Sequence, residues 1–540
     1  MNKIFLLITM FFVCILLVSS VSATNWYVST TSSGTASGDS WANKRNLRDF
    51  TPSFYSSRVM PGDTVYIDGG ANGLTYTYAE NNNSVYATFY WIKSGTVNNK
   101  ITITRGVDPG HNGTPIIQGD YGIGKNAFFG SPSYTEISHL AFENKNNQSI
   151  QQGRYCIYVG AVTNLDIMYN SIKYTYGTAI RTSHAQNVRI MYNTIYTGVT
   201  DEQYTEDVFF FEGNSSRNNE IAYNYVLNEN NFDNAPPFNE TNPEGAHSDI
   251  FQFTGNYQQD GGTTRVHHNF FGNIQDTNGR GKQMMYFNQA TGTFEIYNNI
   301  IVQYSRNDDF AASPEIMFKD IVDNNPTKLV VKIYNNNIIS DSHHTGVFWS
   351  LGIDTVVFKN NLVYLATTIP VGYAPVFLFD LDSNSMPVTW DVDYNRYYKP
   401  EISHFVDFID NQGNHGFISW DVWRSRYNVD THSTIGSFNL VNIGGPSPSD
   451  YMFAPGSRGI DEGTPITGIT DDFVGTSRPQ DSGWDIGAYE YVSVQCAPAD
   501  TDCNNCITLG EVSAYISKWL QGQIDLGQAS SAVSKWLGGC

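Results

Sequence analysis

The sequence predicts an all-β fold in which short parallel strands coil into one long solenoid, followed by a small α-helical module with a calcium loop. Three observations predict it. A short motif around one Asn recurs eight times, a second type of strand alternates with it, and residues 500–540 combine an EF-hand-type loop with a helical repeat. A self-similar unit that returns every few tens of residues is typical of solenoids.

The recurring motif consists of an apolar residue, two further residues, Asn, any residue and a second apolar residue. A clear copy reads Ile167-Met168-Tyr169-Asn170-Ser171-Ile172. Each copy is a β-rich run with alternating apolar positions that ends at a polar turn. The Asn residues of the eight copies are Asn170, Asn193, Asn224, Asn269, Asn299, Asn336, Asn360 and Asn395.

The spacing of these Asn residues varies from 23 residues, between Asn170 and Asn193, to 45 residues, between Asn224 and Asn269. A coil of parallel strands tolerates this variation because each rung contacts only its neighbours and insertions leave as loops. Stacked turns would place the amides above one another, so we expect a hydrogen-bonded Asn ladder. Asn also tolerates the left-handed backbone of a tight turn. The alternative is that Asn is simply common in loops.

The Asn motif resembles the turns of the right-handed parallel β-helix in the pectate-lyase-like superfamily. Two other stretches agree: Pro61 to Ile67 is similar to an early strand of such proteins, and Asp485 to Tyr491 is similar to the stretch that often closes them. The resemblance implies a β-helix with an N-terminal cap over residues 24–492 and a linker at 493–499. It implies a fold rather than a function, because one fold hosts many chemistries.

The chain of 540 residues has a net charge of −21, although only 15 % of its residues are charged. This charge argues against nucleic acid and anionic membranes as partners. It is compatible with divalent cations. It would repel a polyanionic substrate unless a cation or a local basic cluster intervenes.

Residues 1–23 read as a secretory signal peptide. Lys3 precedes an apolar run from Ile4 to Val18, and Val21-Ser22-Ala23 resembles a cleavage site. The alternative is an uncleaved membrane anchor. No later stretch is long and apolar enough to span a bilayer. We therefore expect a secreted protein, extracellular or on the cell surface, with no membrane span in the mature chain.

A second type of strand precedes the Asn motif in each rung, and we expect it at 155–159, 178–182, 207–211, 249–253, 283–287 and 316–319. Alternation of side chains along these strands predicts one inward and one outward column. The inward column is Ile157, Ile180, Phe209, Phe251 and Met284, and the outward column is Tyr158, Arg181, Phe210, Gln252 and Met285. The outward column is a candidate groove for an extended polymer. Long insertions occur at 196–206, 227–247 and 303–314, and such insertions are usually functional or disordered. All three lead into this type of strand, so they should rim the same face.

Candidate catalytic residues lie where these strands begin. Asp207 and Asp249 start equivalent strands on adjacent rungs, so we expect them about 5 Å apart, with His247 beside them and Arg280 and Lys282 on the next rung. In a lyase, such carboxylates hold calcium, and Lys282 is the base we favour, since burial beside other cations lowers the pKa of a Lys. His247 is the reserve base. In a hydrolase, one carboxyl group would protonate the leaving oxygen and another would activate water.

A purely structural interpretation of these residues stands beside the catalytic one. An Asp at the start of a strand often caps a turn, and Lys282 would then only pair with Asp249. The sequence contains no family-specific catalytic signature.

The C-terminal segment from Asp500 to Glu511 fits a calcium loop with EF-hand spacing. The predicted ligands are Asp500, Asp502, Asn504, Cys506 through its carbonyl, Thr508 through water, and Glu511 as the bidentate carboxylate. Asn505 replaces the usual Gly and tolerates the same left-handed geometry. The alternative is an acidic linker followed by two amphipathic helices.

Residues 507–522 repeat at 524–539 without a second calcium loop, and Gln528 stands where the first copy has Glu511. The module resembles a dockerin with one of its two loops intact, which implies a possible protein partner. Cys496, Cys503, Cys506 and Cys540 cluster here, so export allows disulfides of unassigned connectivity. A four-Cys zinc site is the rival, with poor spacing. Cys156 is expected in the core.

Three functions are therefore compatible with the sequence. The first is a secreted carbohydrate-active β-helix protein that binds or cleaves an extracellular, uronate-containing polysaccharide, by calcium-assisted β-elimination if it is a lyase. The second is a non-catalytic surface or adhesion protein that binds glycans. The third is a β-helix glycoside hydrolase. The expected cofactor is Ca²⁺, in the C-terminal loop and, for a lyase, also in the groove.

Overall fold

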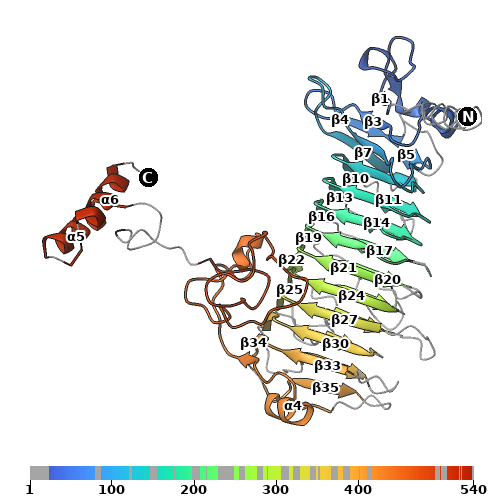
Figure 1. The fold of residues 1–540 in the computed structure, drawn as a ribbon. Helices are drawn as coiled ribbons and strands as arrows, with labels where there is room; N and C mark the ends of the chain where they lie inside the picture. Colours follow the sequence, from blue (N-terminus) through green and yellow to red (C-terminus); the bar gives the residue numbers. More distant parts are fainter. Residues whose placement is uncertain are drawn as a thin grey trace, which may run out of the picture.

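The computed structural model of this protein describes residues 23–537 outside a set of excluded segments. The excluded segments are 79–86, 121–123, 146–154, 175–177, 198–206, 214–215, 229–248, 255–261, 277–283, 289, 306–315, 320–328, 341–347, 351–352, 366–374, 381–388, 401, 410–415, 493–498, 500–506, 522 and 525. Three parallel sheets of 13, 12 and 11 strands, here sheets A, B and C, form the body. The chain passes from sheet C to sheet A to sheet B in each rung, which makes the predicted parallel β-helix (Figure 1).

The strands of each sheet follow the chain from rung to rung. Sheet C holds β5 (Ala87–Trp91), β8 (Asn126–Gly130), β11 (Tyr155–Gly160), β14 (Thr178–Ser183), β17 (Phe209–Glu212), β20 (Phe251–Thr254), β23 (Met285–Asn288), β26 (Ile316–Lys319), β29 (Phe348–Ser350), β32 (Phe377–Asp380) and β35 (Val406–Ile409). Sheet A holds β1 (Asn25–Ser29), β2 (Arg45–Asn46), β3 (Thr64–Ile67), β6 (Ile101–Arg105), β9 (Thr135–Ser138), β12 (Leu165–Met168), β15 (Arg189–Met191), β18 (Glu220–Ala222), β21 (Thr263–His267), β24 (Gly292–Tyr297), β27 (Leu329–Tyr334), β30 (Thr355–Lys359) and β33 (Thr389–Asp393). Sheet B holds β4 (Leu74–Thr77), β7 (Pro115–Asp120), β10 (Ala141–Lys145), β13 (Ser171–Tyr174), β16 (Thr194–Thr197), β19 (Tyr225–Asn228), β22 (Phe270–Asp276), β25 (Ile300–Ser305), β28 (Asn337–Ser340), β31 (Leu362–Leu365), β34 (Arg396–Tyr398) and β36 (Thr434–Ile435).

The core is a continuous column inside the coil, because every strand turns alternate side chains inward. Val, Ile, Leu and Phe fill it, and the Phe rings of sheet C stack from rung to rung, as between Phe287 and Phe318, whose centroids lie 4.4 Å apart. Cys156 is fully buried in this core, as the sequence predicts. Near the N-terminal end lie η1 (Trp41–Asn43), η2 (Leu47–Asp49) and α2 (Pro52–Arg58), and the last two bury Leu47 and Tyr55 in the core. The N-terminal cap stays a prediction.

The predicted Asn ladder is present in the turn between sheets A and B. In each rung the Asn side-chain amide donates to the side-chain oxygen of the next Asn, with N···O distances of 3.1 Å from Asn170 to Asn193 and 3.0 Å from Asn193 to Asn224. The same amide nitrogen also donates to a backbone carbonyl of the preceding rung. Because each buried amide is satisfied, each rung gains about 1 kcal/mol per net hydrogen bond. The ladder consists of Asn170, Asn193, Asn224, Asn269, Asn299, Asn336, Asn361 and Asn395.

Two details of the sequence prediction were wrong. The ladder residue of the seventh copy is Asn361 rather than Asn360, because Phe358 aligns with Ile333 and shifts the motif by one residue. The second detail is the left-handed backbone, which is adopted by the residue before each ladder Asn and not by the ladder Asn itself. That column, here the left-handed column, is His139, Tyr169, Tyr192, Tyr223, His268, Asn298, Asn335, Asn360 and Tyr394, with φ between 51° and 57°.

Residues 436–491, here the cover, fold back over the outer face of sheet B. Apolar residues of β19 to β31 are sealed under it, including Phe270, Ile300 and Leu362 at 0–1 % exposure. The stretch from Asp485 to Tyr491 contacts the coil directly, because the Gly487 backbone N–H donates to the Asn360 carbonyl at 2.7 Å. A Cβ on Gly487 would lie 2.2 Å from the Asn337 side-chain oxygen, so only glycine permits this approach.

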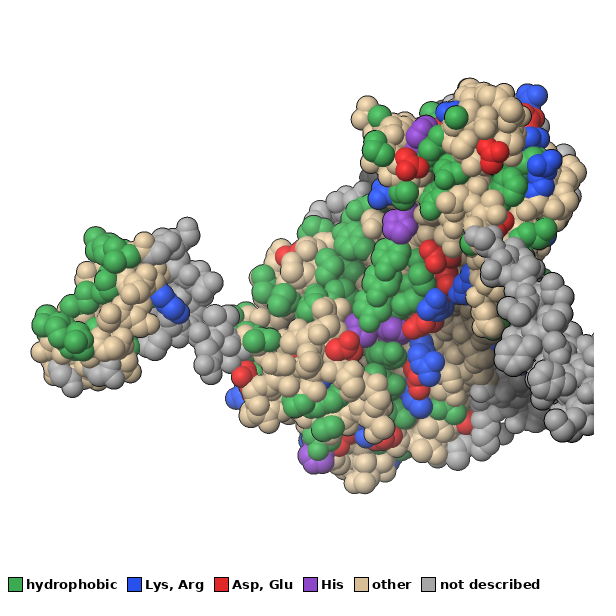
Figure 2. Space-filling view, turned by 45° about the horizontal axis from the view of Figure 1, so that its top comes forward, with side chains coloured by type: hydrophobic (Ala, Val, Ile, Leu, Met, Phe, Trp, Pro, Cys, Tyr) green, Lys and Arg blue, Asp and Glu red, His purple; other side chains and the backbone are tan. Residues whose placement is uncertain are grey.

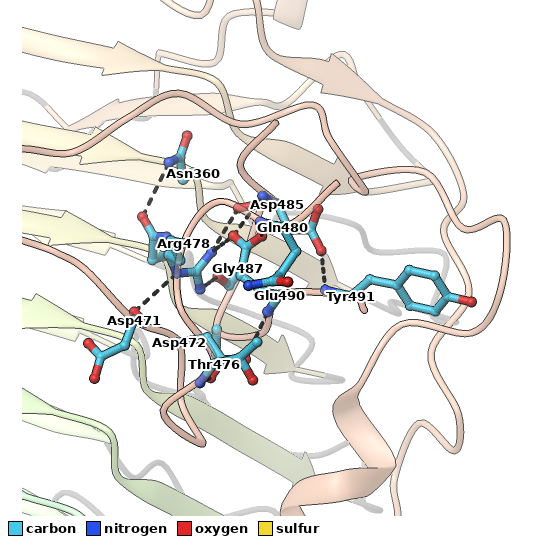
Figure 3. A network of polar contacts seen from close by, with 12 residues as sticks. Asn360, Asp471, Asp472, Thr476, Arg478, Gln480, Asp485, Gly487, Glu490 and Tyr491 are labelled. Carbon is cyan, nitrogen blue, oxygen red and sulfur yellow. Dashed lines mark hydrogen bonds and ion pairs between the residues drawn. The ribbon is translucent and has the colours of Figure 1, made fainter. Parts of the chain in front are cut away.

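A buried ion pair holds the cover together (Figure 3). Arg478 Nη1 donates to Glu490 Oε1 at 2.6 Å, and both side chains are fully buried. Arg478 Nη2 also donates to the Gly487 carbonyl (2.8 Å). Burial raises the pKa of nearby Asp485 to about 7, against the lowering effect of the Asp461 and Tyr491 amides that donate to it. Desolvated charges of this kind persist only when they are fully paired.

The remaining helices are short. The helix α4 (Trp420–Tyr427) buries Trp420 and Trp423 against the core, and η5 (Pro448–Tyr451) lies in the cover. The C-terminal helices α5 (Leu509–Leu520) and α6 (Leu526–Leu537) pack against each other. Among the described residues, none of the helices is long and apolar enough to cross a membrane.

Candidate substrate-binding face

The outer face of sheet C is the candidate site. The strand register aligns Tyr90, Phe129, Tyr158, Arg181, Phe210, Gln252 and Tyr286 in one outward column. The prediction was correct from Tyr158 to Gln252 and wrong by one residue in β23. Met285 aligns with Phe251 and is fully buried, while Tyr286 faces outward. Two adjacent Met residues give no alternation by which the sequence could fix this register.

Aromatic rings line the first rungs of this column. The Tyr90 and Phe129 rings stack with centroids 5.8 Å apart, and Phe129 and Tyr158 follow at 5.2 Å. All three side chains are half-buried. Burial, and then the charge of Glu212, raises the pKa of the Tyr158 hydroxyl, so it stays neutral and able to donate at physiological pH. The strip therefore offers apolar ring surface with polar edges along the direction of the coil.

Arg181 interrupts the aromatic strip with one positive charge. Its guanidinium group makes a two-point ion pair with Glu212, with Nε–Oε1 and Nη2–Oε2 distances of 3.2 and 2.5 Å. The guanidinium carbon lies 4.6 Å from the centre of the Tyr155 ring and 4.8 Å from that of Phe210. The side chains of Arg181 and Glu212 are only 21 % and 25 % exposed. A planar, partly desolvated guanidinium group between rings suits a carboxylate or hydroxyl group of a ligand.

Asp207 and Asp249 lie on adjacent rungs, just before β17 and β20, as expected. The Asp249 backbone N–H donates to Asp207 Oδ1 at 3.0 Å, and the Val208 N–H donates to the Asp249 carbonyl at 2.9 Å. Both side chains are buried, at 3 % and 0 % exposure. The described contacts thus give Asp207 a capping role in the turn, which is the structural interpretation of this residue. Its catalytic role stays a prediction.

The other predicted catalytic residues, His247, Arg280 and Lys282, lie outside the described residues. The catalytic roles of these three residues therefore stay predictions. Carboxylate oxygens are suitable calcium ligands, but one oxygen of Asp207 already accepts a backbone N–H. Among the described residues, no group of three or more His, Cys, Asp or Glu side chains is arranged to hold a metal ion.

The predicted C-terminal calcium loop falls mostly outside the described residues, which exclude Asp500, Asp502, Asn504 and Cys506. Thr508 and Glu511 are described, and they form a capping box at the start of α5. The Thr508 N–H donates to Glu511 Oε2 at 2.9 Å, and the Glu511 N–H donates to Thr508 Oγ1 at 3.3 Å. This reciprocal capping explains why a helix begins here. Calcium binding by these two residues stays a prediction.

The ion pair of Arg181 with Glu212 was not predicted from the sequence. The sequence could have indicated this pair. Glu212 lies two positions after Phe210 and therefore shares its outward face, and Phe210 is the neighbour of Arg181 on the next strand. The contact itself is diagonal between rungs and depends on the register, which the sequence did not fix in every rung.

The comparisons with known proteins give a likeness of fold. No protein-family model matches this chain, and no curated protein matches it. Among solved structures it is similar to pectate lyase Pel9A (14 % identity, 87 % of this chain, 98 % of that chain, TM-score 0.47). It is also similar to a rhamnogalacturonan lyase (12 % identity, 69 % of this chain, 87 % of that chain, TM-score 0.43). A third similar structure is a GH136 lacto-N-biosidase from Eubacterium ramulus (11 % identity, 76 % of this chain, 68 % of that chain, TM-score 0.37). At these identities the likeness concerns the parallel β-helix alone.

Proposed function

We propose that this protein is a secreted, carbohydrate-active β-helix protein that binds an extended polysaccharide along the outer face of sheet C. The observation that carries the proposal is the half-buried strip of Tyr90, Phe129, Tyr158 and Phe210 with Arg181 among its rings. Sugar rings have apolar faces that pack on aromatic surface, and their hydroxyl groups need polar partners beside it. A strip that runs across successive parallel strands suits a long chain rather than a compact ligand.

We further propose that the bound chain contains uronate and is cleaved by β-elimination. A base removes the proton from the carbon next to the uronate carboxylate. The glycosidic oxygen then leaves the neighbouring carbon with its bonding electrons and takes up a proton, while a carbon–carbon double bond forms. Lys282 is the base we favour, with His247 in reserve and Arg280 beside it. Asp207 and Asp249 would hold a calcium ion, which neutralises the uronate carboxylate.

A second candidate function is favoured by the hydrogen bond between the Asp249 N–H and Asp207 Oδ1. If these carboxylates only cap their turns, the face binds glycans without cleaving them, as in an adhesion protein. The C-terminal module would then serve attachment, with calcium in the loop of Asp500 to Glu511 and a protein partner on its helices. Hydrolysis by the same carboxylates is a third possibility for the chemistry.

One experiment separates these functions. The protein of residues 24–540 is incubated with uronate-containing and neutral polysaccharides, with calcium or with chelator, while unsaturated-uronate absorbance and reducing ends are measured. We expect new absorbance that chelator abolishes and that Lys282→Ala removes, with polymer binding retained. Reducing ends without absorbance would instead indicate a hydrolase, and binding without either product would indicate the adhesion function.

The binding face is tested separately with Phe210→Ala and Arg181→Ala. We expect each to weaken polymer binding about tenfold, the effect of losing one well-packed contact of about 1.4 kcal/mol. Lys173→Ala is the matched control, because Lys173 is exposed on the outer face of sheet B. Equal binding by all three variants and the wild type would contradict the assignment of sheet C as the binding face.

A further inference from the structure

A second surface of exposed aromatic rings follows the left-handed column. The rings of Tyr169, Tyr192 and Tyr223 stack almost in parallel, with centroids 4.9 and 4.8 Å apart and interplanar angles of 5° and 7°. His139 continues the stack at one end and His268 at the other, at 5.2 and 4.7 Å. Tyr169 and Tyr192 are 50 % and 40 % exposed. Since the ring faces cover one another, solvent reaches the ring edges and the phenolic hydroxyl groups.

Tyrosine is a costly residue for this column. A left-handed backbone costs a bulky residue about 1 kcal/mol or more, whereas Asn adopts it readily. The same column contains Asn298, Asn335 and Asn360, and two of these bond to the cover. Asn298 donates to the Asp471 carbonyl (2.8 Å) and Asn360 donates to the Thr464 carbonyl (2.7 Å). Hence the cover packs on Asn298, Asn360 and the buried His268, whereas Tyr169 and Tyr192 occupy positions that solvent reaches. The fold alone therefore does not demand tyrosine at these exposed positions.

The charged residues beside the column compensate one another. On the outer face of sheet A, Asp166 binds Arg189 through two contacts of 2.8 and 2.9 Å and also pairs with Lys100. Further along, Glu295 pairs with Arg265 at 2.9 Å and with Lys332 at 3.1 Å. Figure 2 shows this face, where hydrophobic side chains run beside a line of acidic and basic ones. Paired charges of both signs leave little net field to attract a polyelectrolyte.

We propose that the column of His139, Tyr169, Tyr192 and Tyr223 is a second polysaccharide-binding surface, which takes an uncharged chain lengthwise along the coil. The hydroxyl groups and ring edges repeat once per rung, and an extended sugar chain advances by roughly one ring per rung. Each sugar can therefore meet an equivalent tyrosine. The compensated charges beside the column favour a neutral polymer over a uronate polymer. This surface is formed at the turn between sheets A and B, so the proposal does not rest on the sheet C site.

The test uses the protein of residues 24–540 and two probes, a soluble neutral β-linked glucan and polygalacturonate, with retention measured by affinity electrophoresis. The Tyr169→Asn/Tyr192→Asn double variant introduces the residue that this column already contains at Asn298. We expect its affinity for the neutral glucan to fall about tenfold through the loss of two ring contacts. Retention on polygalacturonate should be unchanged, as should the melting temperature, because lost stacking is offset by relief of backbone strain.

Tyr394→Asn is the matched control. Tyr394 lies in the same column with φ 57° and stacks on His432 at 4.6 Å, but Asn298, Asn335 and Asn360 separate it from the tyrosine stack along the column. We expect it to bind the neutral glucan like the wild type. If the Tyr169→Asn/Tyr192→Asn double variant also binds the neutral glucan like the wild type, the proposal is wrong. If, in addition, the double variant has a much lower melting temperature, the stack has a purely structural role.

A second pair of substitutions keeps the proposal testable if the double Asn variant does not fold. Tyr169→Phe/Tyr192→Phe preserves the stack and removes only the hydroxyl groups, so the fold should be retained. We expect about threefold weaker binding of the neutral glucan. Wild-type binding by this variant, together with concentration-dependent self-association that it abolishes, would assign the surface to a second copy of the chain and overturn the proposal.

Discussion

The outer faces of sheets B and C are both rich in apolar side chains, but the chain treats them differently. On sheet B, Phe270, Ile300 and Leu362 are sealed under the cover at 0–1 % exposure. On sheet C, Tyr158, Arg181 and Phe210 are only half-buried. The covered face is mainly aliphatic, whereas the open face has aromatic rings with a guanidinium group between them.

This difference agrees with the role proposed for sheet C. A β-helix buries one side of every strand in its own core, so outward apolar residues need another cover. Sheet B obtains that cover from residues 436–491 of the same chain. On sheet C, rings with polar edges remain accessible, which suits the proposed ligand-binding role better than that of a core. The same reasoning applies to the left-handed column, whose exposed tyrosines give way to Asn298, Asn335 and Asn360.

The largest effect is expected where the cover is held by a buried ion pair. Arg478→Ala removes the partner of Glu490, whose side chain is fully buried. We expect a loss of about 3–5 kcal/mol in unfolding free energy, because an uncompensated charge stays in the interior. Chemical denaturation monitored by circular dichroism would measure it.

The control for this prediction is Arg458→Ala. Arg458 also lies in the cover and pairs with Glu462 at 3.5 Å, but its side chain is 73 % exposed. An exposed pair contributes at most about 0.5 kcal/mol, so this variant should remain close to wild type. Similar losses in the two variants would mean that burial of the Arg478 pair does not control the stability of the cover.

The second prediction contrasts the two faces directly with the same substitution. Phe270→Ala should cost about 3–5 kcal/mol of unfolding free energy, since it leaves a cavity between sheet B and the cover. Phe210→Ala should cost about 1 kcal/mol or less, because its ring is half-exposed, while it weakens polymer binding. Denaturation and affinity electrophoresis on both variants measure the two effects. If Phe210→Ala were as destabilising as Phe270→Ala, the outer face of sheet C would be packed like a core rather than open to a ligand.

The third effect concerns pH at the edge of the cover, and it is the smallest at neutral pH because it grows only as pH falls below 6.5. Burial, and then the charge of His267, lowers the pKa of His268 to about 3, against the Asp472 carbonyl that favours its protonation. His267 Nδ1 lies 2.7 Å from His268 Nδ1, and Asn298 Nδ2 lies 3.1 Å from His268 Nε2, so neutral His268 accepts from Asn298 and donates to His267. Other charged or titratable groups around it are Tyr223, Asp471 and Arg478.

The sign of the pH effect follows from these pKa values. The unfolded chain binds a proton at this residue below pH 6.5 and the folded chain only near pH 3, so stability falls as pH drops from 6.5 towards 3. The slope from this one group is at most about 1.4 kcal/mol per pH unit. His268→Asn should flatten the profile in that window. Asp485, with its pKa raised to about 7, contributes with the opposite sign, so the difference between variant and wild type is the measured quantity.

The sequence predicted much of the candidate face, and its errors have a common cause. Tyr158 and Phe210 have apolar neighbours on both sides, so only their alignment with other strands placed them outward. Alternation placed Arg181 and Gln252 outward correctly, because apolar residues with inward side chains adjoin them. It failed at Met284 and Met285, where both neighbours are apolar, and at Asn360 and Asn361, where both are Asn. A period of two has no information when adjacent residues are alike, so only pairing with the next rung decides the register.

The sequence by itself determined the parallel coil and the Asn ladder, because these depend on contacts between equivalent residues of neighbouring rungs. Only the tertiary structure decided which outer face is covered. Arg478 and Glu490 lie far along the chain from Phe270 and Asn298, and no periodic pattern connects them. It also decided that tyrosines occupy the left-handed turn positions that stay exposed. Those choices depend on how the cover packs across several rungs at once, which is a property of the assembled fold rather than of any local stretch.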